Sequence, residues 1–547
     1  MSADHVFHSG RIFDGHDLHP TATAVAVEGD RVVAVGTDEQ VRPLATSATE
    51  SVDLAGRLLH PGFTDAHVHA VQAGVERLGC DLSETEGEPA TLAAVAAYAG
   101  GSDQPWIVGG GWSMADYPGG TPSAATLDRI GAIGDRPTFL VNRDHHGAWV
   151  NSAALRLAGI DAHTPDPADG RIERDAEGRP TGTLHEGAMD LVGRLRPPTT
   201  NADLLAGLVE AQRVLHGFGI TGWQEAIIGD YAATPDVMPA YLQAIDEGLL
   251  TGRVVGALWW PRDVEDVEQA VSSLAAVRAA HPSGPFRPTS VKIMIDGVPE
   301  NRTAAMKDPY LTECTCGGDE RGIAYFDTDL LHRSVVALDA AGFDVHMHAI
   351  GDRAVASGLD AVERARQANG RSNGRHHLAH VQIVDPVDIP RFAALGVSAN
   401  LQALWAANDP QMVSLTKPLL GPERSSWQYP FASFAQHGTH LAMGSDWPVS
   451  TPDPWAAIHV AVCRREPGLA DQEPLVAEQA LTLTQALRAY TAGSAWINRN
   501  DQGGRIRPGA LADLAVCGAD PFTLNATELH TARTDLTMVG GRIVHAA

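Results

Sequence analysis

The most constraining feature of the sequence is a long alternation of strand-like and helix-like segments. Apolar runs typical of buried strands occur at residues 58–70, 219–226, 253–260, 289–298, 343–351, 376–384, 396–402 and 440–448. Ala-rich stretches with a helical pattern lie between them, among them residues 202–217, 235–249, 264–281, 328–341 and 353–369. Eight strands that alternate with helices predict an α/β fold, a parallel (β/α)8 TIM barrel, over residues 58–504.

Both ends of the chain carry short β-rich runs that are broken by Gly-Asp or Gly-Gly turns. This pattern is typical of hairpins. The simplest arrangement joins residues 1–57 and 505–547 into one small β-sandwich domain built from both termini. Two separate terminal hairpins are the alternative.

The connection between residues 70 and 219 is far too long for a simple loop. Because barrel enzymes place their long loops at the C-terminal face, we expect residues 75–200 to form an inserted subdomain over the active site. A second long connection, residues 403–437, is rich in Trp, Pro and Ser. We expect it to be a non-helical pocket wall or lid.

Composition narrows the class of protein. The chain has 547 residues with 44% apolar residues, and 40 basic against 67 acidic residues give a net charge of -27. Nucleic acids and anionic membranes require basic surfaces, so we expect neither as a partner and expect a small-molecule substrate instead. The chain has five scattered cysteines, which favours a reducing compartment. Cys314 and Cys316 are interpreted as part of a loop.

The first residues lack a basic segment followed by an apolar one, so no classical secretory signal is visible and a cytoplasmic location is expected. No apolar run approaches the ~20 residues that a membrane helix needs. The sequence leaves the oligomeric state open, with a homodimer as a common outcome for large soluble enzymes.

Histidines and an aspartate collect where the predicted barrel strands end. His67 and His69 form an HxH pair, and alternate residues of a strand face the same side, so both imidazoles point at one place. Further strand ends carry His348, His380 and Asp446. The alternative is a chance set of structural histidines. A metal site at the C-terminal face of the barrel accounts better for four strand ends that carry His or Asp.

Three other histidines have different expected roles. His346 and His376 lie deeper along their strands, so we expect them to support other residues or to pack in the core. His377 alternates with His376 and points to the other side.

Four motifs resemble those of the amidohydrolase superfamily. They are PGFTDAHVH, the GDRA that follows His346 and His348, the HxxH of His377 and His380 on the sixth strand, and GSDWP on the eighth. VKIMIDG followed by RTAAM, and HAIGDRAV, resemble the superfamily's YtcJ-like branch, which includes N-substituted formamide deformylases. The resemblance covers essentially the whole chain. It implies one or two divalent metal ions per chain, zinc first, bound by His67, His69, Lys292, His348, His380 and Asp446.

Lys292 lies within an apolar strand and has two interpretations. A buried lone ammonium is costly, so the lysine must be paired or modified. The resemblance implies an N6-carboxylated Lys292 that bridges two metal ions. The structural alternative is an ion pair with an acid such as Asp296, and the metal site would then be mononuclear.

The implied reaction is hydrolysis of a C–N amide-type bond, in an amide or N-substituted formamide, by a metal-activated water. Asp446 would act as the general base and would then pass the proton to the leaving amine, and His380 would polarise the carbonyl group. Hydrolysis of a cyclic amide, carbamate or ester, or a deamination, remains open at the same site. A catalytically inactive binding protein is the remaining alternative, although every expected ligand position is filled.

In the family that the sequence resembles, segments of the insertion and nearby loops lie around the pocket, and they supply candidate pocket residues. We expect the substrate pocket to include Trp112, Tyr117, Asp144, His145, His146, Glu186 and Arg302. Ordinary structural hydrogen bonding is the alternative for each residue. The aromatic residues of the insertion, Trp149 included, favour an apolar substrate.

Overall fold

A computed structural model describes residues 3–231, 234–311 and 320–547. Cys314 and Cys316, predicted to lie in a loop, fall outside the described residues. The central sheet has eight parallel strands, and all eight match the predicted segments. In chain order they are β7 (Phe63–Val68), β14 (Ile220–Ile228), β15 (Arg253–Trp259), β16 (Phe286–Met294), β17 (Asp344–Ala349), β18 (His377–His380), β19 (Ser398–Leu401) and β20 (Leu441–Met443).

The first and last strands of this sheet approach each other and nearly close it into a barrel. Just beyond β20, the Asp446 amide donates a hydrogen bond to the His67 carbonyl (2.7 Å), and the His69 amide donates to the Trp447 carbonyl (2.9 Å). Gly444 permits this approach, because a Cβ atom there would lie 2.4 Å from the amide nitrogen of His67. The predicted α/β barrel is therefore confirmed.

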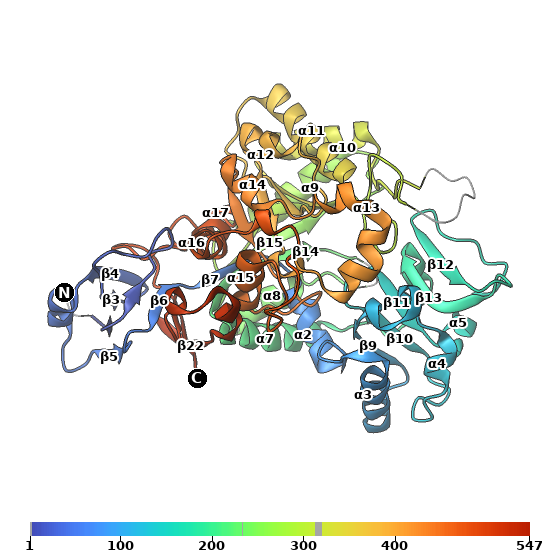
Figure 1. The fold of residues 1–547 in the computed structure, drawn as a ribbon, viewed down its shortest axis with the longest axis horizontal. Coiled ribbons are helices and arrows are strands. Elements are labelled where there is room, and N and C mark those ends of the chain that lie inside the picture. The colour runs from blue at the N-terminus through green and yellow to red at the C-terminus, as the bar shows by residue number, and fades with distance from the viewer. Residues whose placement is uncertain (1–2, 232–233, 312–319) are drawn as a thin grey trace.

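Helices cover the outside of the barrel (Figure 1). The five predicted helical stretches correspond to α7 (Asn201–Gly217), α8 (Met238–Asp246), α9 (Val267–Ala280), α10 (Thr328–Ala340) and α11 (Asp352–Asn369). Side-chain caps fix several helix starts: Thr200 accepts a hydrogen bond from the Asp203 amide, and Asp327 accepts one from the Leu330 amide. The buried faces of these helices and the strands form one large apolar cluster.

Strands from both termini meet in one sheet. The five-stranded sheet runs in the order β2 (Arg11–Ile12), β6 (Leu58–Pro61), β21 (Leu514–Cys517), β22 (Thr534–Val539) and β23 (Arg542–Ala546). A four-stranded sheet consists of β4 (Arg31–Gly36), β3 (Ala24–Glu28), β1 (His5–His8) and β5 (Glu50–Asp53). Residues of both sheets share a buried apolar cluster, and both termini lie on the same side of the barrel in Figure 1. The description as one sandwich domain stays a prediction.

The first predicted strand, residues 58–70, is in fact two strands. β6 (Leu58–Pro61) pairs with β21 in the terminal sheet, and β7 (Phe63–Val68) begins the barrel. The chain turns at Gly62, where a Cβ atom would lie 2.2 Å from the Thr221 side chain. The change of sheet thus falls at residue 62 and not at the predicted position 57–58.

The long connection after β7 contains a six-stranded sheet. Its order is β12 (Gly170–Arg174), β13 (Pro180–Glu186), β11 (Gly147–Val150), β10 (Thr138–Asn142), β9 (Ile107–Trp112) and β8 (Cys80–Asp81). Figure 1 shows these strands on the side of the barrel opposite the termini. They have apolar clusters of their own.

The segment 403–437 contains helices, contrary to the expectation of a non-helical loop. It contains α13 (Lys417–Ser425), α14 (Phe431–Gln436) and a π-helical turn, Met412–Thr416. Pro418 is the second residue of α13, which begins directly after this π-helical turn. Within the described residues, no helix is long and apolar enough to cross a membrane.

Candidate metal centre

Four predicted ligands meet at the C-terminal end of the barrel. His67 is the next-to-last residue of β7, His69 follows that strand, His380 ends β18, and Asp446 follows β20. The Nε2 atoms of His67 and His69 each lie 3.3 Å from Oδ1 of Asp446, and Nδ1 of His380 lies 3.8 Å from its Oδ2. His380 and Asp446 have φ angles of 75° and 56°, a left-handed conformation that is uncommon for residues other than glycine and gathers at functional sites.

Two buried neighbours hold His67 in place. Nδ1 of His67 lies 2.8 Å from Nε2 of His346, and the His67 amide donates to Oδ1 of Asp65 (3.1 Å). Because His346 occupies Nδ1, the Nε2 atom of His67 faces Asp446. His376 instead bonds to Asp339 (2.8 Å) in the core.

His348 and Lys292 complete the set of predicted ligands. The His348 ring lies 4.4 Å from the His380 ring, and Nζ of Lys292 lies 3.4 Å from Nε2 of His67. Asp296, the alternative partner of Lys292, accepts hydrogen bonds from the backbone amides of Ala305, Ile350 and Gly351 instead. Within the described residues no carboxylate lies within 4 Å of Lys292, so its amine is buried without an ion pair.

Burial controls the charges of this cluster. Desolvation, with the nearby Lys292, lowers the pKa of His67 to about 3. Desolvation also lowers the pKa of Lys292 to about 8. Burial alone would raise the pKa of Asp446, but the adjacent His67, His69 and His380 rings outweigh it and hold this pKa well below its usual range. The site thus combines neutral imidazoles with an ionised carboxylate, the protonation state in which these groups bind metals.

The donor atoms of the site fit a divalent cation. Potential ligand atoms of His67, His380 and Asp446 all lie within 4.8 Å of one another. Both ring nitrogens of His380 and Oδ1 of Asp446 are buried and have no hydrogen-bond partner in the described part of the chain. Buried polar atoms are normally paired. A converging set of nitrogen and oxygen donors without partners is what zinc and similar ions bind.

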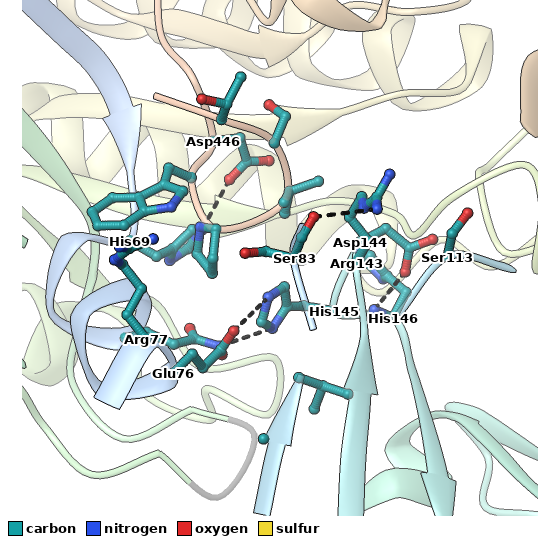
Figure 2. A pocket seen from close by; sticks show the side chains of 18 of the residues that line it. His69, Glu76, Arg77, Ser83, Ser113, Arg143, Asp144, His145, His146 and Asp446 are labelled. Atoms are coloured by element: carbon teal, nitrogen blue, oxygen red, sulfur yellow. Dashed lines mark hydrogen bonds and ion pairs between the residues drawn. The ribbon is translucent and has the colours of Figure 1, made fainter. Parts of the chain in front are cut away.

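A cavity of about 1430 Å³ opens over this cluster. Asp144, His145 and His146, from the turn between β10 and β11, line it together with His67, His348 and other residues of the barrel mouth. Figure 2 shows His145 turned toward Glu76, with Nε2 3.5 Å from the carboxylate. The inserted segment therefore supplies part of the pocket wall.

Four predicted pocket residues lie away from the cavity surface. Trp112 and Tyr117 pack with Trp149 in a buried aromatic cluster inside the insertion, and none of the three lines the cavity. Their large apolar surfaces are needed for the core of the insertion, which is why they do not face the substrate space. Arg302 forms a half-exposed ion pair with Glu320 (3.0 Å), and Glu186 lies behind His146.

Trp405 is one of the residues that line the cavity but were not among the predicted site residues. The indole of Trp405 lies parallel to the His380 imidazole, with ring centroids 5.3 Å apart and an interplanar angle of 3°. It donates a hydrogen bond through Nε1 to Ser450 (3.3 Å). The Trp-containing segment after β19 was expected to form a pocket wall, but nothing in its sequence indicates which side chain stacks on a predicted ligand.

Comparisons with known proteins find relatives over almost the whole chain. The model of the amidohydrolase family matches residues 50–545. YtcJ of Bacillus subtilis is 30% identical over 548 residues, 99% of each chain. The N-substituted formamide deformylase of Arthrobacter pascens is 27% identical over 546 residues, 95% of this chain and 94% of its own. A solved structure, an uncharacterized metal-dependent hydrolase from Pyrococcus horikoshii, has a TM-score of 0.72 at 23% identity and covers 95% of this chain and 99% of its own.

Proposed function

Because this chain belongs to the amidohydrolase family, we propose that it hydrolyses the C–N bond of small amides, N-substituted formamides first. The observation that carries the proposal is the convergence of donor atoms from His67, His380 and Asp446 at the barrel mouth, where both ring nitrogens of His380 and Oδ1 of Asp446 have no hydrogen-bond partner among the described residues. Similarity to the formamide deformylase of Arthrobacter pascens supports the choice of substrate. The wall formed by Trp405 suits an apolar substituent on the nitrogen.

The residues that would hold the cation are His67, His69, Lys292, His348, His380 and Asp446. When bound, a divalent ion such as zinc supplies an acidified water and polarises a carbonyl oxygen. Asp446, held ionised by its histidine neighbours, takes a proton from the attacking water. His380, fixed against Trp405, orients the carbonyl group of the substrate.

Lys292 decides how many ions the site holds. Its Nζ is buried, faces His67 and has no acidic partner among the described residues. Carboxylation would replace this uncompensated amine with an anion that would help to hold two cations, and it would remove the cost of the buried ammonium. We therefore propose a binuclear site with an N6-carboxylated Lys292.

Elemental analysis tests the metal site. We expect about two metal ions per chain in the wild type purified with bicarbonate, and one or none in Lys292→Ala, with unchanged content in the control Lys417→Ala. One ion in both proteins would show that Lys292 is structural. No metal in any of them would refute the proposed hydrolase.

An activity screen tests the reaction. The metal-loaded wild type is assayed with N-substituted formamides, longer amides, cyclic amides, carbamates, esters and amino-heterocycles. Release of formate and amine from the formamides is expected. Turnover only of the other groups would replace formamides as the substrate class, and no turnover with any of them would contradict hydrolysis at this site.

A further inference from the structure

The proposed hydrolysis assigns no role to His146, which lines the cavity, or to Glu186, which lies behind it. His146 follows β10, and its Nδ1–H donates to both carboxylate oxygens of Glu186 at 3.0 Å. Its amide donates to Asp144 (2.9 Å), and its carbonyl accepts from the Asn301 side chain (3.0 Å) and from the Glu186 amide (3.1 Å). These hydrogen bonds fix both the backbone and the ring of His146.

Glu186 lies between the insertion and the barrel. It is buried, and it also accepts a hydrogen bond from the hydroxyl of Thr303 (2.8 Å). A Cβ atom at Gly297 would lie 2.6 Å from Oε1 of Glu186, so the glycine makes room for the carboxylate. The φ angle of Glu186, 50°, is a strained conformation of the kind that persists where the surroundings impose it. A buried carboxylate needs a cationic partner, and His146 forms the ion pair with it.

The other ring nitrogen of His146 faces the reaction space. Nε2 has no hydrogen-bond partner among the described residues, and His146 lines the cavity. Its ring lies 5.8 Å from the His348 ring, which in turn lies 4.4 Å from that of His380. An amide whose carbonyl group lies over the cluster would extend its nitrogen toward this side of the cavity.

We propose that His146 is a catalytic residue that protonates the leaving nitrogen, and that Glu186 is its positioning residue. The inference rests on the proposed amide hydrolysis. The water oxygen bonds to the carbonyl carbon, and the water proton goes to Asp446. The C–N bond then breaks, its electron pair stays on nitrogen, and the Nε2–H proton forms the new N–H bond. His146 and Asp446 return to their starting states by exchanging one proton with the open cavity, so the sum is amide plus water to acid plus amine.

The basicity of the leaving amine provides the test. Expulsion of a basic alkylamine needs a proton, whereas 4-nitroaniline leaves with little help. In His146→Asn, kcat for N-butylformamide is expected to fall on the order of 100-fold or more, the range for loss of a general acid. The loss for 4-nitroformanilide should be much smaller. Glu186→Gln keeps an acceptor for Nδ1 but removes the charge, so it should show the same dependence on the leaving group in a weaker form, in kcat more than in KM.

A second histidine–glutamate pair in the same subdomain serves as the control. His185, the neighbour of Glu186 in β13, lies 3.2 Å from Glu173 and does not line the cavity. His185→Asn should leave kcat unchanged for both substrates. Metal content and the Tm of each variant identify any loss caused by misfolding. Glu186→Gln, which is nearly isosteric, keeps the test valid where the His146→Asn substitution impairs folding.

Three results would overturn the inference. Equal losses for both substrates in His146→Asn and Glu186→Gln would show a structural role, and so would a loss as large in His185→Asn. No loss in either site variant would show that His146 takes no part in the reaction. A wild type that hydrolyses neither formamide, nor any other amide, would instead refute the proposed function on which the inference rests.

Discussion

Glu225 should make the stability of the folded protein depend on pH. It lies on β14 and is buried between the barrel and α8, where burial raises its pKa to about 8, although its carboxylate accepts a hydrogen bond from the Tyr241 hydroxyl (2.5 Å). The pKa of the folded state therefore lies above the ordinary value of 4.5. The folded state holds this proton more tightly than the unfolded state, so stability is full below pH 4.5 and is lost as the pH rises toward 8.

The size of the effect follows from the shift. Each pKa unit corresponds to about 1.4 kcal/mol, so between pH 5 and pH 8 the loss is about 3.5 kcal/mol. With an unfolding entropy of about 2.1 cal/mol/K per residue, a chain of this length would lose about 3 °C in Tm. In Glu225→Gln the side chain cannot ionise, so this loss is absent.

Thermal unfolding of the two proteins at pH 5, 6.5 and 8 measures the effect. The Tm of Glu225→Gln minus that of the wild type should rise by about 3 °C over this range, because other titrating groups cancel in the difference. Glu247→Gln, at an exposed position of the same barrel, should show a flat difference. A flat difference for Glu225→Gln as well would refute the assignment of a protonated, buried carboxyl group.

Three further substitutions test packing and the site. Asp339→Ala removes a buried acceptor that Arg366, Asn369, Ser372 and His376 share, and it should lower the stability by about 3–5 kcal/mol, measured by denaturant unfolding. Gly444→Ala brings a Cβ atom against the backbone of His67, so metal content should fall at unchanged secondary structure; unchanged metal content would contradict the close approach. Trp405→Ala removes the ring stacked on His380, so KM for apolar formamides should rise more than KM for N-methylformamide, and an equal change would argue against an apolar wall.

The sequence indicated the barrel correctly because its signals are local. Each barrel strand is a short apolar run and each covering helix has its own periodic pattern, so eight strands and five helices could be located before any contact was known. The membership of the amidohydrolase family, and with it the class of hydrolases acting on C–N bonds other than peptide bonds, was predicted from motifs that are also local and is confirmed. His67 and His69 illustrate this, since two residues on one strand face share a direction without help from the rest of the chain.

Tertiary structure decided what depends on segments far apart in the sequence. The run at residues 58–70 is continuous in sequence, but pairing with β21 assigns Leu58–Pro61 to another sheet. Trp112 and Tyr117 were expected in the pocket because of the segment in which they lie, yet the core of the insertion buries them. Trp405 on His380, and Glu186 behind His146, join residues that are 25 and 40 positions apart through packing alone. Local sequence patterns specify the helices and strands and the direction of their side chains. The surroundings of a side chain depend instead on which apolar surfaces from distant segments are buried against each other.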